Sequence, residues 1–427
     1  MENTVKPTSL WQKFLTIVLA FGPGIFAIGY TIGTGSVTTM VISGSDHGMQ
    51  LLWVLFLSCY FSGVLMYVYG KYALISGDTA LHGFKQHLTG GKALAILIIV
   101  GITFGQWNSL MGILGISSNI IYELLAIRFP SFVDHKYGVV LGIAITIITI
   151  FYGIMLIGKY TFFEKILVIF VSIMGLSFIV SLFFVHPLPK DVALGLIPSI
   201  PQVEGGRMLV AAFVGTTMAA ATFLSRPLFI RGKGWTREHL TTQRNDAIIA
   251  ACLVFLISAS IMAVAHGALY NSGKTVTKVL DMAGTLEPIA GNLAVTIFFF
   301  GTLSAGLSSI FPCLLIAPLL LADYQSGELD TSSNQFKIIT FIACLFALIV
   351  PIFGANPIQL QILSQVFNVF VLPAVIIGIF FLTNRMDVMD GNKFSLFIKI
   401  SLVVSLIFAL VISYNGVLGV LEFFQKE

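Results

Sequence analysis

The 427-residue chain has few charged residues: Asp, Glu, Lys and Arg make up 10% of it, whereas apolar residues make up 57%. Soluble domains carry about 25% charged residues. So little charge leaves too few polar groups to cover a surface in water, which excludes an ordinary soluble protein. Uncharged stretches of about 20 residues recur, and this length spans a bilayer as an α-helix. We therefore expect an all-α integral membrane protein.

Groups that commonly carry chemistry are also scarce. The four cysteines fall inside apolar segments and have no CxxC spacing, so they indicate neither a disulfide framework nor a metal cluster. The expected helix interiors contain very few acids and no paired histidines, which argues against a cofactor-binding pump. The sequence also lacks a loop that resembles an ion-channel filter, which argues against a channel. The net charge of +4 gives no indication of nucleic acid. We expect no enzyme activity, no cofactor and no nucleic-acid partner.

Apolar runs between charged or Gly/Pro-rich breaks predict eleven membrane helices. Sixteen of the 23 Lys and Arg residues fall on the side that holds the N-terminus and seven on the other, which predicts a cytoplasmic N-terminus and an external C-terminus. The N-terminal segment lacks a cleavable signal pattern, so we expect the first helix to remain. The expected helices are 12–44, 50–75, 93–121, 138–158, 163–185, 208–230, 247–270, 291–322, 338–353, 357–383 and 395–420.

Two of these helices contain weak helix formers at mid-depth. The first carries "IGYTIGTGSVTTMVISGS", Ile28 to Ser45, and the sixth carries "AAFVGTTMAAATFLSRPLFI". Small residues of this kind also allow close helix packing. Broken helices at corresponding places in two halves, however, are typical of the substrate site of secondary transporters. Because the two segments lie five helices apart, we favour a substrate site.

The tenth expected helix carries a further polar cluster in "QILSQVFNVFVLPA". Ser364, Gln365 and Asn368 lie within about one turn of each other. They could simply form interhelical hydrogen bonds, each worth about 0.6 kcal/mol on average. Alternatively, Gln365 faces the central site.

Several of these segments resemble the Nramp family of proton-coupled divalent metal transporters. The similar segments are "FGPGIFAIGY" with "GSVTTMVISGSDHGMQLLWVLFLS", "FGTLSAGLSS" and "LSQVFNVFVLP". They occur in the family's order over nearly the whole chain. The resemblance implies a LeuT-like fold, with two inverted five-helix repeats at 12–185 and 208–383 and an extra helix at 395–420. Residues 1–427 would then form one transmembrane transporter domain.

The family's metal ligands are missing at the positions that an ungapped comparison assigns. The Asp-Pro-Gly-Asn motif of the first break falls on Gly33, Thr34, Gly35 and Ser36. The Met-Pro-His motif of the sixth helix falls on Ala219, Ala220 and Ala221. Acidic residues of the third helix would lie within Gln106 to Gly112, where Asn108 and Ser109 stand instead, and one family histidine becomes Arg226. Gln365 keeps the family residue.

Arg226 allows two interpretations. It could extend to the membrane surface near the cytoplasmic helix end, or it could face the inward vestibule, where its charge would repel cations and suit an anionic or zwitterionic solute. His266 likewise could couple protons or, as we favour, form a hydrogen bond near the outer end of its helix.

We therefore expect a secondary transporter, in a bacterial inner membrane, whose transported partner is a small solute or ion. A divalent metal cation bound through hydroxyls, carbonyls and Gln365 ranks first. A small organic acid or amino acid is the alternative, and a non-transporting sensor has no support in the sequence. The expected substrate-binding residues are Gly33, Thr34, Ser36, Ala219, Thr222 and Gln365; Ser36 and Gln365 are the expected metal ligands, and Arg226 and Asn108 line the vestibule or gate.

Overall fold

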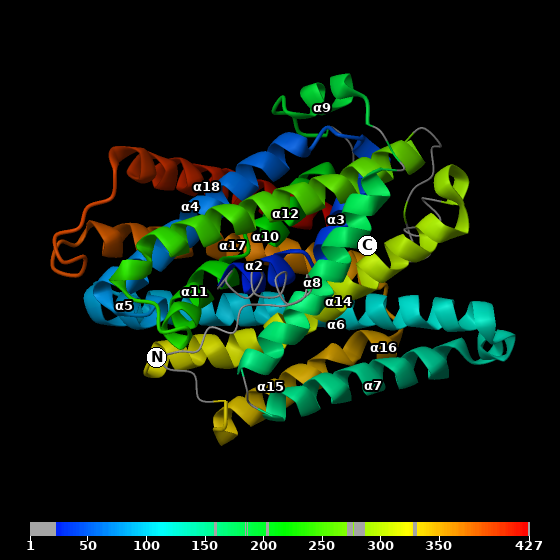
Figure 1. The fold of residues 1–427 in the computed structure, drawn as a ribbon, viewed down its shortest axis with the longest axis horizontal. Coiled ribbons are helices and arrows are strands. Elements are labelled where there is room, and N and C mark those ends of the chain that lie inside the picture. The colour runs from blue at the N-terminus through cyan, green and yellow to red at the C-terminus, as the bar shows by residue number, and fades with distance from the viewer. Residues whose placement is uncertain are drawn as a thin grey trace, which may run out of the picture.

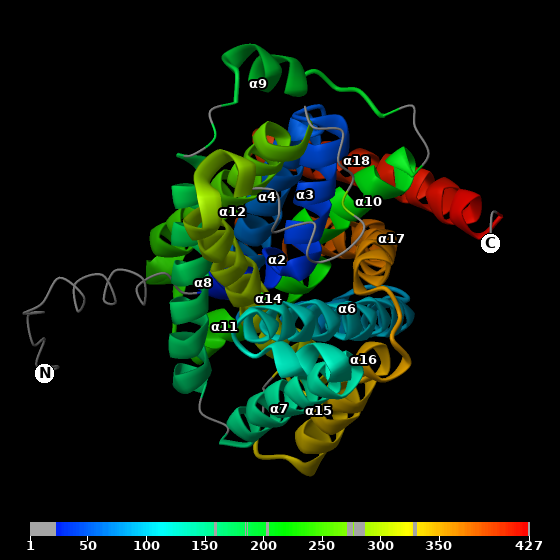
Figure 2. The same ribbon diagram turned by 90° about the vertical axis from the view of Figure 1, so that its right-hand side faces the viewer.

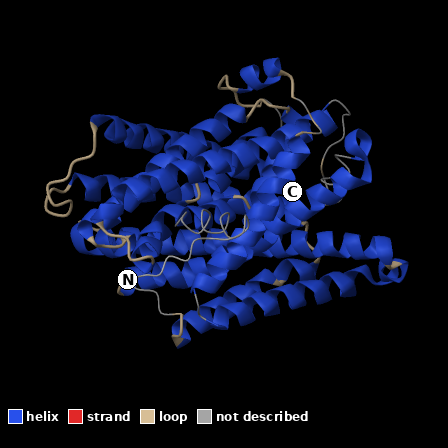
Figure 3. Cartoon of the chain, viewed as in Figure 1, coloured by secondary structure: helices blue, strands red, loops and turns tan. Residues whose placement is uncertain are grey.

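Every element of regular structure in the described part of this computed structural model is a helix (Figures 1 and 3). The structure describes residues 23–157, 160–183, 185, 187–201, 205–270, 276, 287–327 and 331–425. Residues 12–22 of the first expected helix lie outside this part. The helices are α2 (Pro23–Thr31), α3 (Thr34–His47), α4 (Leu52–Ser76), α5 (Ala80–His87), α6 (Gly91–Arg128), η1 (Pro130–His135), α7 (Lys136–Ile157), α8 (Tyr160–Leu182), α9 (Pro189–Gly195), α10 (Gly206–Thr217), α11 (Ala220–Gly232), η2 (Arg237–His239), α12 (Leu240–Leu269), α14 (Glu287–Gln325), α15 (Asn334–Ala347), α16 (Ile349–Phe353), α17 (Pro357–Asn384) and α18 (Leu396–Phe424).

The number of spans agrees with the sequence. Within the described residues, ten stretches are long and apolar enough to cross a membrane, and α2 with α3 forms an eleventh that bends by 52° at its break. Among the ten, α10 with α11 makes one span and α15 with α16 makes another. The short helices α5 and α9 were not expected. Figures 1 and 2 show α9 lying outside the bundle, over one end of it.

Local sequence explains several helix ends. The Asn356 side chain accepts a hydrogen bond from the Ile358 N–H at 3.0 Å, and Pro357 occupies the first helical position of α17. Both residue types are favoured there, because Asn satisfies a free N–H and proline has none to satisfy. Gly77 ends α4 in the left-handed conformation, with φ +73°. Glycine is the usual residue at this position because it has no Cβ to clash.

The broken helices lie at the centre of the bundle. In the apolar stretch that covers α10 and α11, 94% of residues are buried, against 28% in α18. The central span therefore packs against protein on nearly all sides, whereas α18 is peripheral (Figure 2). Polar groups at the breaks are thus sheltered from lipid. The division into inverted repeats at 12–185 and 208–383 stays a prediction.

Candidate functional site

Both predicted breaks are present, and they face each other. The first lies between Thr31 and Thr34, where α2 ends and α3 begins, and the second separates α10 from α11. A helix end leaves carbonyl groups without intrahelical partners. At the first break two of these carbonyls are satisfied by side chains: Ser309 Oγ of α14 donates to Gly29 O at 2.8 Å. Thr216 Oγ1, beside the second break, donates to Thr31 O at 3.2 Å. The Thr216–Thr31 hydrogen bond thus joins the two breaks directly.

A small cavity of about 20 Å³ lies between the breaks. This volume is enough for one water molecule or one ion of similar size. Of the described residues that line it, none is an Asp, Glu or His. The lining residues are Tyr30, Gly33, Gly35, Ser36, Gln106, Ser109, Ile113, Thr216, Ala219, Ser309, Cys313 and Gln365.

Two hydroxyl groups in this lining have no protein partner. Tyr30 and Ser36 are 8% and 1% exposed, and neither Tyr30 Oη nor Ser36 Oγ forms a hydrogen bond within the described structure. A buried hydroxyl without a partner costs about 1–3 kcal/mol. Such groups require an explanation, and a bound ion or water in the adjoining cavity supplies one.

One wall of the cavity is a network of side-chain amides on α17 and α6. Gln365 Nε2 donates to Ser109 Oγ at 3.2 Å and to Gln361 Oε1 at 3.3 Å. Gln365 Oε1 accepts from Asn368 Nδ2 at 3.1 Å, and Gln106 Nε2 donates to Asn368 Oδ1 at 2.9 Å. An amide oxygen has two lone pairs. Gln365 Oε1 therefore keeps one for a ligand while the network fixes its position.

Glycines let the amide wall approach the breaks. A Cβ on Gly35 would lie 2.5 Å from Gln365 Nε2 and 2.6 Å from Gln361 Oε1. A Cβ on Gly215 would collide with the backbone carbonyl of Gln365. The small residues therefore do allow close helix packing, and this packing brings Gln365 to the cavity.

Four of the expected site residues do not line the cavity: Thr34, Thr222, Asn108 and Arg226. Thr34 is buried one layer behind it, and its Oγ1 accepts from Gln361 Nε2 at 3.4 Å. Thr222 Oγ1 donates to Ala219 O at 2.7 Å within its own helical turn. Asn108 is partly buried and donates to Phe104 O of its own helix at 2.7 Å, so its side chain does not line the cavity, and its vestibule role stays a prediction. Gly33, Ser36, Ala219 and Gln365 do line it.

Arg226 neither extends to the membrane surface nor lines the cavity. It is 1% exposed, and its Nη2 lies 2.5 Å from Asp246 Oδ2 of α12. Asp246 also accepts the Gly24 N–H, at 3.0 Å and 3.2 Å, at the N-terminal end of α2. The carboxylate offsets the arginine charge and the positive end of the helix dipole together. Arg226 therefore holds α11, α12 and α2 together, and its charge is compensated rather than presented to a substrate.

Sequence reasoning missed Cys313, whose thiol donates to Gln106 Oε1 at 3.5 Å on the cavity wall. It also missed Gln361, which is four residues before Gln365 and hence on the same helix face. Among the described residues, no three His, Cys, Asp or Glu side chains gather as a metal cluster.

His266 pairs with Asp191 of α9 at 3.3 Å. This contact agrees with the preferred hydrogen-bonded role.

Comparisons with known proteins agree with this architecture. A divalent metal cation transporter MntH of Klebsiella pneumoniae is 23% identical over 431 residues, covering 97% of this chain and 96% of that protein. A variant of the manganese transporter of Eremococcus coleocola has a similar structure, with a TM-score of 0.73 at 16% identity, covering 99% of this chain and 90% of that one. MhsT in complex with L-phenylalanine has a TM-score of 0.62 at 18% identity, covering 95% and 98%. These two structures confirm the expected LeuT-like fold.

The profile of the family described as natural resistance-associated macrophage protein-like, Nramp, matches residues 24–419. This range contains both breaks, the amide wall and the Arg226–Asp246 pair. The chain belongs to the Nramp family.

Proposed function

We propose that this protein is a secondary transporter that carries a divalent metal cation across the membrane through the cavity between its two broken helices. The observation that carries the proposal is the cavity itself. It is enclosed by oxygen donors, it has the volume of one ion or water, and two of its hydroxyls have no other partner. The MntH relatives, named as divalent metal cation transporters, support the same activity.

The donor set favours a hard cation. Tyr30 Oη, Ser36 Oγ and Gln365 Oε1 are neutral oxygens, and oxygen ligands suit Mg²⁺, Mn²⁺ and Ca²⁺. No carboxylate among the described lining residues offsets the cost of dehydrating the ion. We therefore propose that the ion keeps part of its hydration shell, and that this site opens wider than the present cavity when the ion enters.

Cys313 supplies the one soft donor in the lining. Thiol sulfur suits ions such as Zn²⁺ better than Mg²⁺. Its place on α14 differs from that of Ala219, the N-cap of α11, where the family resemblance put a methionine. We propose that Cys313 adjusts which ions are accepted, while the oxygens provide most of the binding.

The alternative, an organic acid or amino acid, is not favoured. Sites for small organic molecules usually measure about 300–1,000 Å³, so the cavity of about 20 Å³ would have to widen far more for such a solute than for a partly hydrated ion. Arg226 was the group that suited an anionic solute, and its charge is taken by Asp246. No other Lys or Arg is among the described lining residues.

We further propose that the N-terminus lies in the cytoplasm and the C-terminus outside, in a bacterial inner membrane, and that the chain has no enzyme activity. The distribution of Lys and Arg supports the orientation. We also propose the two inverted repeats, since each contains one broken span that contributes to the same cavity.

Uptake of Mn²⁺ into proteoliposomes tests the function. The purified chain should accumulate the ion, and Ser36→Ala should reduce the initial rate by about three- to tenfold, the range expected from losing one hydroxyl contact. Ser58→Ala is the matched control, because Ser58 Oγ is also buried without a partner but lies outside the cavity. Absence of uptake of Mn²⁺, Mg²⁺ and Ca²⁺ alike would contradict the function. Equal loss in both variants would contradict the site.

A further inference from the structure

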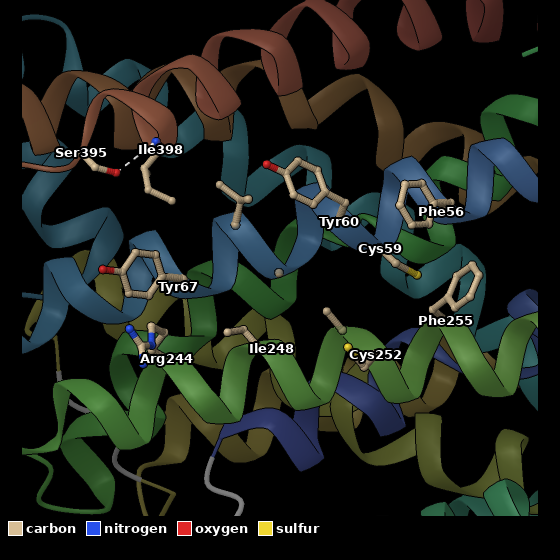
Figure 4. A pocket seen from close by; sticks show the side chains of 13 residues that line it. Phe56, Cys59, Tyr60, Tyr67, Arg244, Ile248, Cys252, Phe255, Ser395 and Ile398 are labelled. Atoms are coloured by element: carbon tan, nitrogen blue, oxygen red, sulfur yellow. Dashed lines mark hydrogen bonds between the residues drawn. The ribbon is translucent and has the colours of Figure 1, made fainter. Parts of the chain in front are cut away.

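A long apolar groove separates α4 from α12 beside the start of α18 (Figure 4). Its volume is about 570 Å³, within the range of ligand sites, and it lies outside the ion cavity. Most of the surface is apolar. The lining residues are Phe56, Cys59, Tyr60, Gly63, Val64, Tyr67, Arg244, Ile248, Ala251, Cys252, Phe255, Ser395 and Ile398.

The groove runs along the two helices for about half the thickness of a membrane. Phe56 and Tyr67 are eleven positions apart on α4, which corresponds to a rise of about 16 Å along the helix. Phe56 and Phe255 close one end with ring centroids 6.0 Å apart. The hydrocarbon core of a bilayer is about 30 Å thick. The groove therefore has the length of a single leaflet, which suits one acyl chain.

Small residues create the groove. Gly63 of α4 faces Ala251 of α12, and a Cβ on Gly63 would lie 3.1 Å from the Ala251 Cβ. The two helices touch at this level, and neither residue has a side chain long enough to fill the space outside the contact. In Figure 4, Cys59 and Cys252 point toward this space from opposite helices.

The other end of the groove is basic. Arg244 is exposed there, opposite Tyr67, and forms no hydrogen bond or ion pair within the described structure. Lys71 lies one turn beyond Tyr67 on α4, with its Nζ 4.4 Å from the centre of the Phe394 ring and 3.4 Å from Lys393 O.

The acids nearest in the sequence to Arg244 and Lys393 have other partners. Asp246 pairs with the buried Arg226, Asp390 pairs with Arg237 at 2.7 Å, and Asp387 pairs with Arg385 at 2.7 Å. The charges of Arg244, Lys71 and Lys393 therefore remain available to an outside anion.

We propose that the groove binds an anionic phospholipid, with one acyl chain between α4 and α12 and its phosphate beside Arg244. The apolar wall suits the acyl chain, the length of the groove matches one leaflet, and the uncompensated basic end suits the phosphate. Basic pockets between membrane helices bind anionic headgroups, at about 1 kcal/mol for each Lys or Arg near the surface.

Cys252 reports on the groove, because it is exposed while Cys59, Cys313 and Cys344 are buried. The test measures the rate at which N-ethylmaleimide modifies Cys252 in the detergent-solubilised full chain, by mass spectrometry, at increasing mole fractions of phosphatidylglycerol or phosphatidylcholine. We expect phosphatidylglycerol to slow the reaction at about a fivefold lower mole fraction than phosphatidylcholine. Cys252→Ser gives the background rate.

Arg244→Gln should make the two lipids equally protective, whereas Arg244→Lys should keep the preference. The matched control is Arg207→Gln, because Arg207 is an exposed arginine paired with Glu422 at the far end of α18; it should leave the preference unchanged. Equal protection by both lipids in the unmodified chain would overturn the anionic headgroup. No protection by either lipid would overturn the site.

Discussion

Replacing Gly33 with aspartate would restore the carboxylate that the family resemblance places at the first break. Gly33 has φ −102° and ψ −171°, a conformation open to any residue. Packing opposes a larger residue at this position, because a Cβ there would collide with Ser309 Oγ and lie 2.9 Å from the Ser309 Cβ. Overpacking of this kind costs about 1–3 kcal/mol. Gly33→Asp alone should therefore be destabilised by that amount and gain little metal affinity.

The double variant Gly33→Asp with Ser309→Gly should behave differently. Glycine at 309 removes both clashing atoms, at about 1 kcal/mol for a glycine inside α14. It also releases the Gly29 carbonyl, which Ser309 Oγ now occupies. With a carboxylate and a further carbonyl in the cavity, Mn²⁺ binding should tighten by at least about tenfold, or ~1.4 kcal/mol. That gain is modest beside the attraction of about 4 kcal/mol between two unit charges 4 Å apart near a protein surface.

Thermal unfolding and calorimetric titration with Mn²⁺ measure the two effects separately, with Ser309→Gly alone as the control. A double variant that is stable but binds Mn²⁺ no more tightly than Ser309→Gly would contradict the expected gain in affinity. In that case position 33 does not face the ion. If Gly33→Asp alone is as stable as the unmodified chain, the packing argument is wrong.

Three further predictions concern other parts of the structure. Asp246→Asn leaves the buried Arg226 charge uncompensated and should cost about 3–5 kcal/mol in chemical denaturation, whereas the exposed pair partner Asp390→Asn should cost under about 1 kcal/mol; equal losses would contradict the account. Cys313→Ser should weaken Zn²⁺ binding about tenfold relative to Mg²⁺ in competition titrations, while Cys344→Ser, buried elsewhere, should not. Asn108→Ala should leave Mn²⁺ uptake unchanged, since the side chain bonds to Phe104 O of its own helix and does not line the cavity; a tenfold loss of uptake would show that Asn108 takes part in transport.

The sequence predicted the breaks because weak helix formers act locally. Glycine and threonine at the first break, and the glycine, threonines and alanines at the second, weaken a helix wherever it packs. The two breaks appear where these residues predicted them. Gln365 lines the cavity, as its position suggested, because a long polar side chain in an apolar central helix is most stable in a polar interior.

The orientation of short polar side chains was harder to predict. Asn108 and Ser109 are neighbours, and successive helix residues are about 100° apart around the axis. Only the packing of α17 against α6 decides that Ser109 faces the cavity and Asn108 does not. Thr222 was misplaced because a hydroxyl can bond within its own turn. Nothing in its local sequence distinguishes that bond from a bond to a substrate.

Arg226 shows a second limit. Its partner, Asp246, lies on the next span, and the pair exists because α11 and α12 bring those two positions together at the end of α2. The hydropathy of each helix does not predict that pairing.

Cys313 could not be assigned from the sequence either. A thiol in an apolar run resembles any small core residue, and only the fold shows that it lies on a polar cavity.

A calorimetric titration of Mn²⁺ and Mg²⁺ into the purified chain, compared with the Ser36→Ala and Ser58→Ala variants, tests directly whether a cation binds between the broken helices. We expect saturable binding that Ser36→Ala weakens and Ser58→Ala leaves intact. No binding of either divalent cation at millimolar concentration, or identical isotherms for all three proteins, would contradict a cation site between the broken helices.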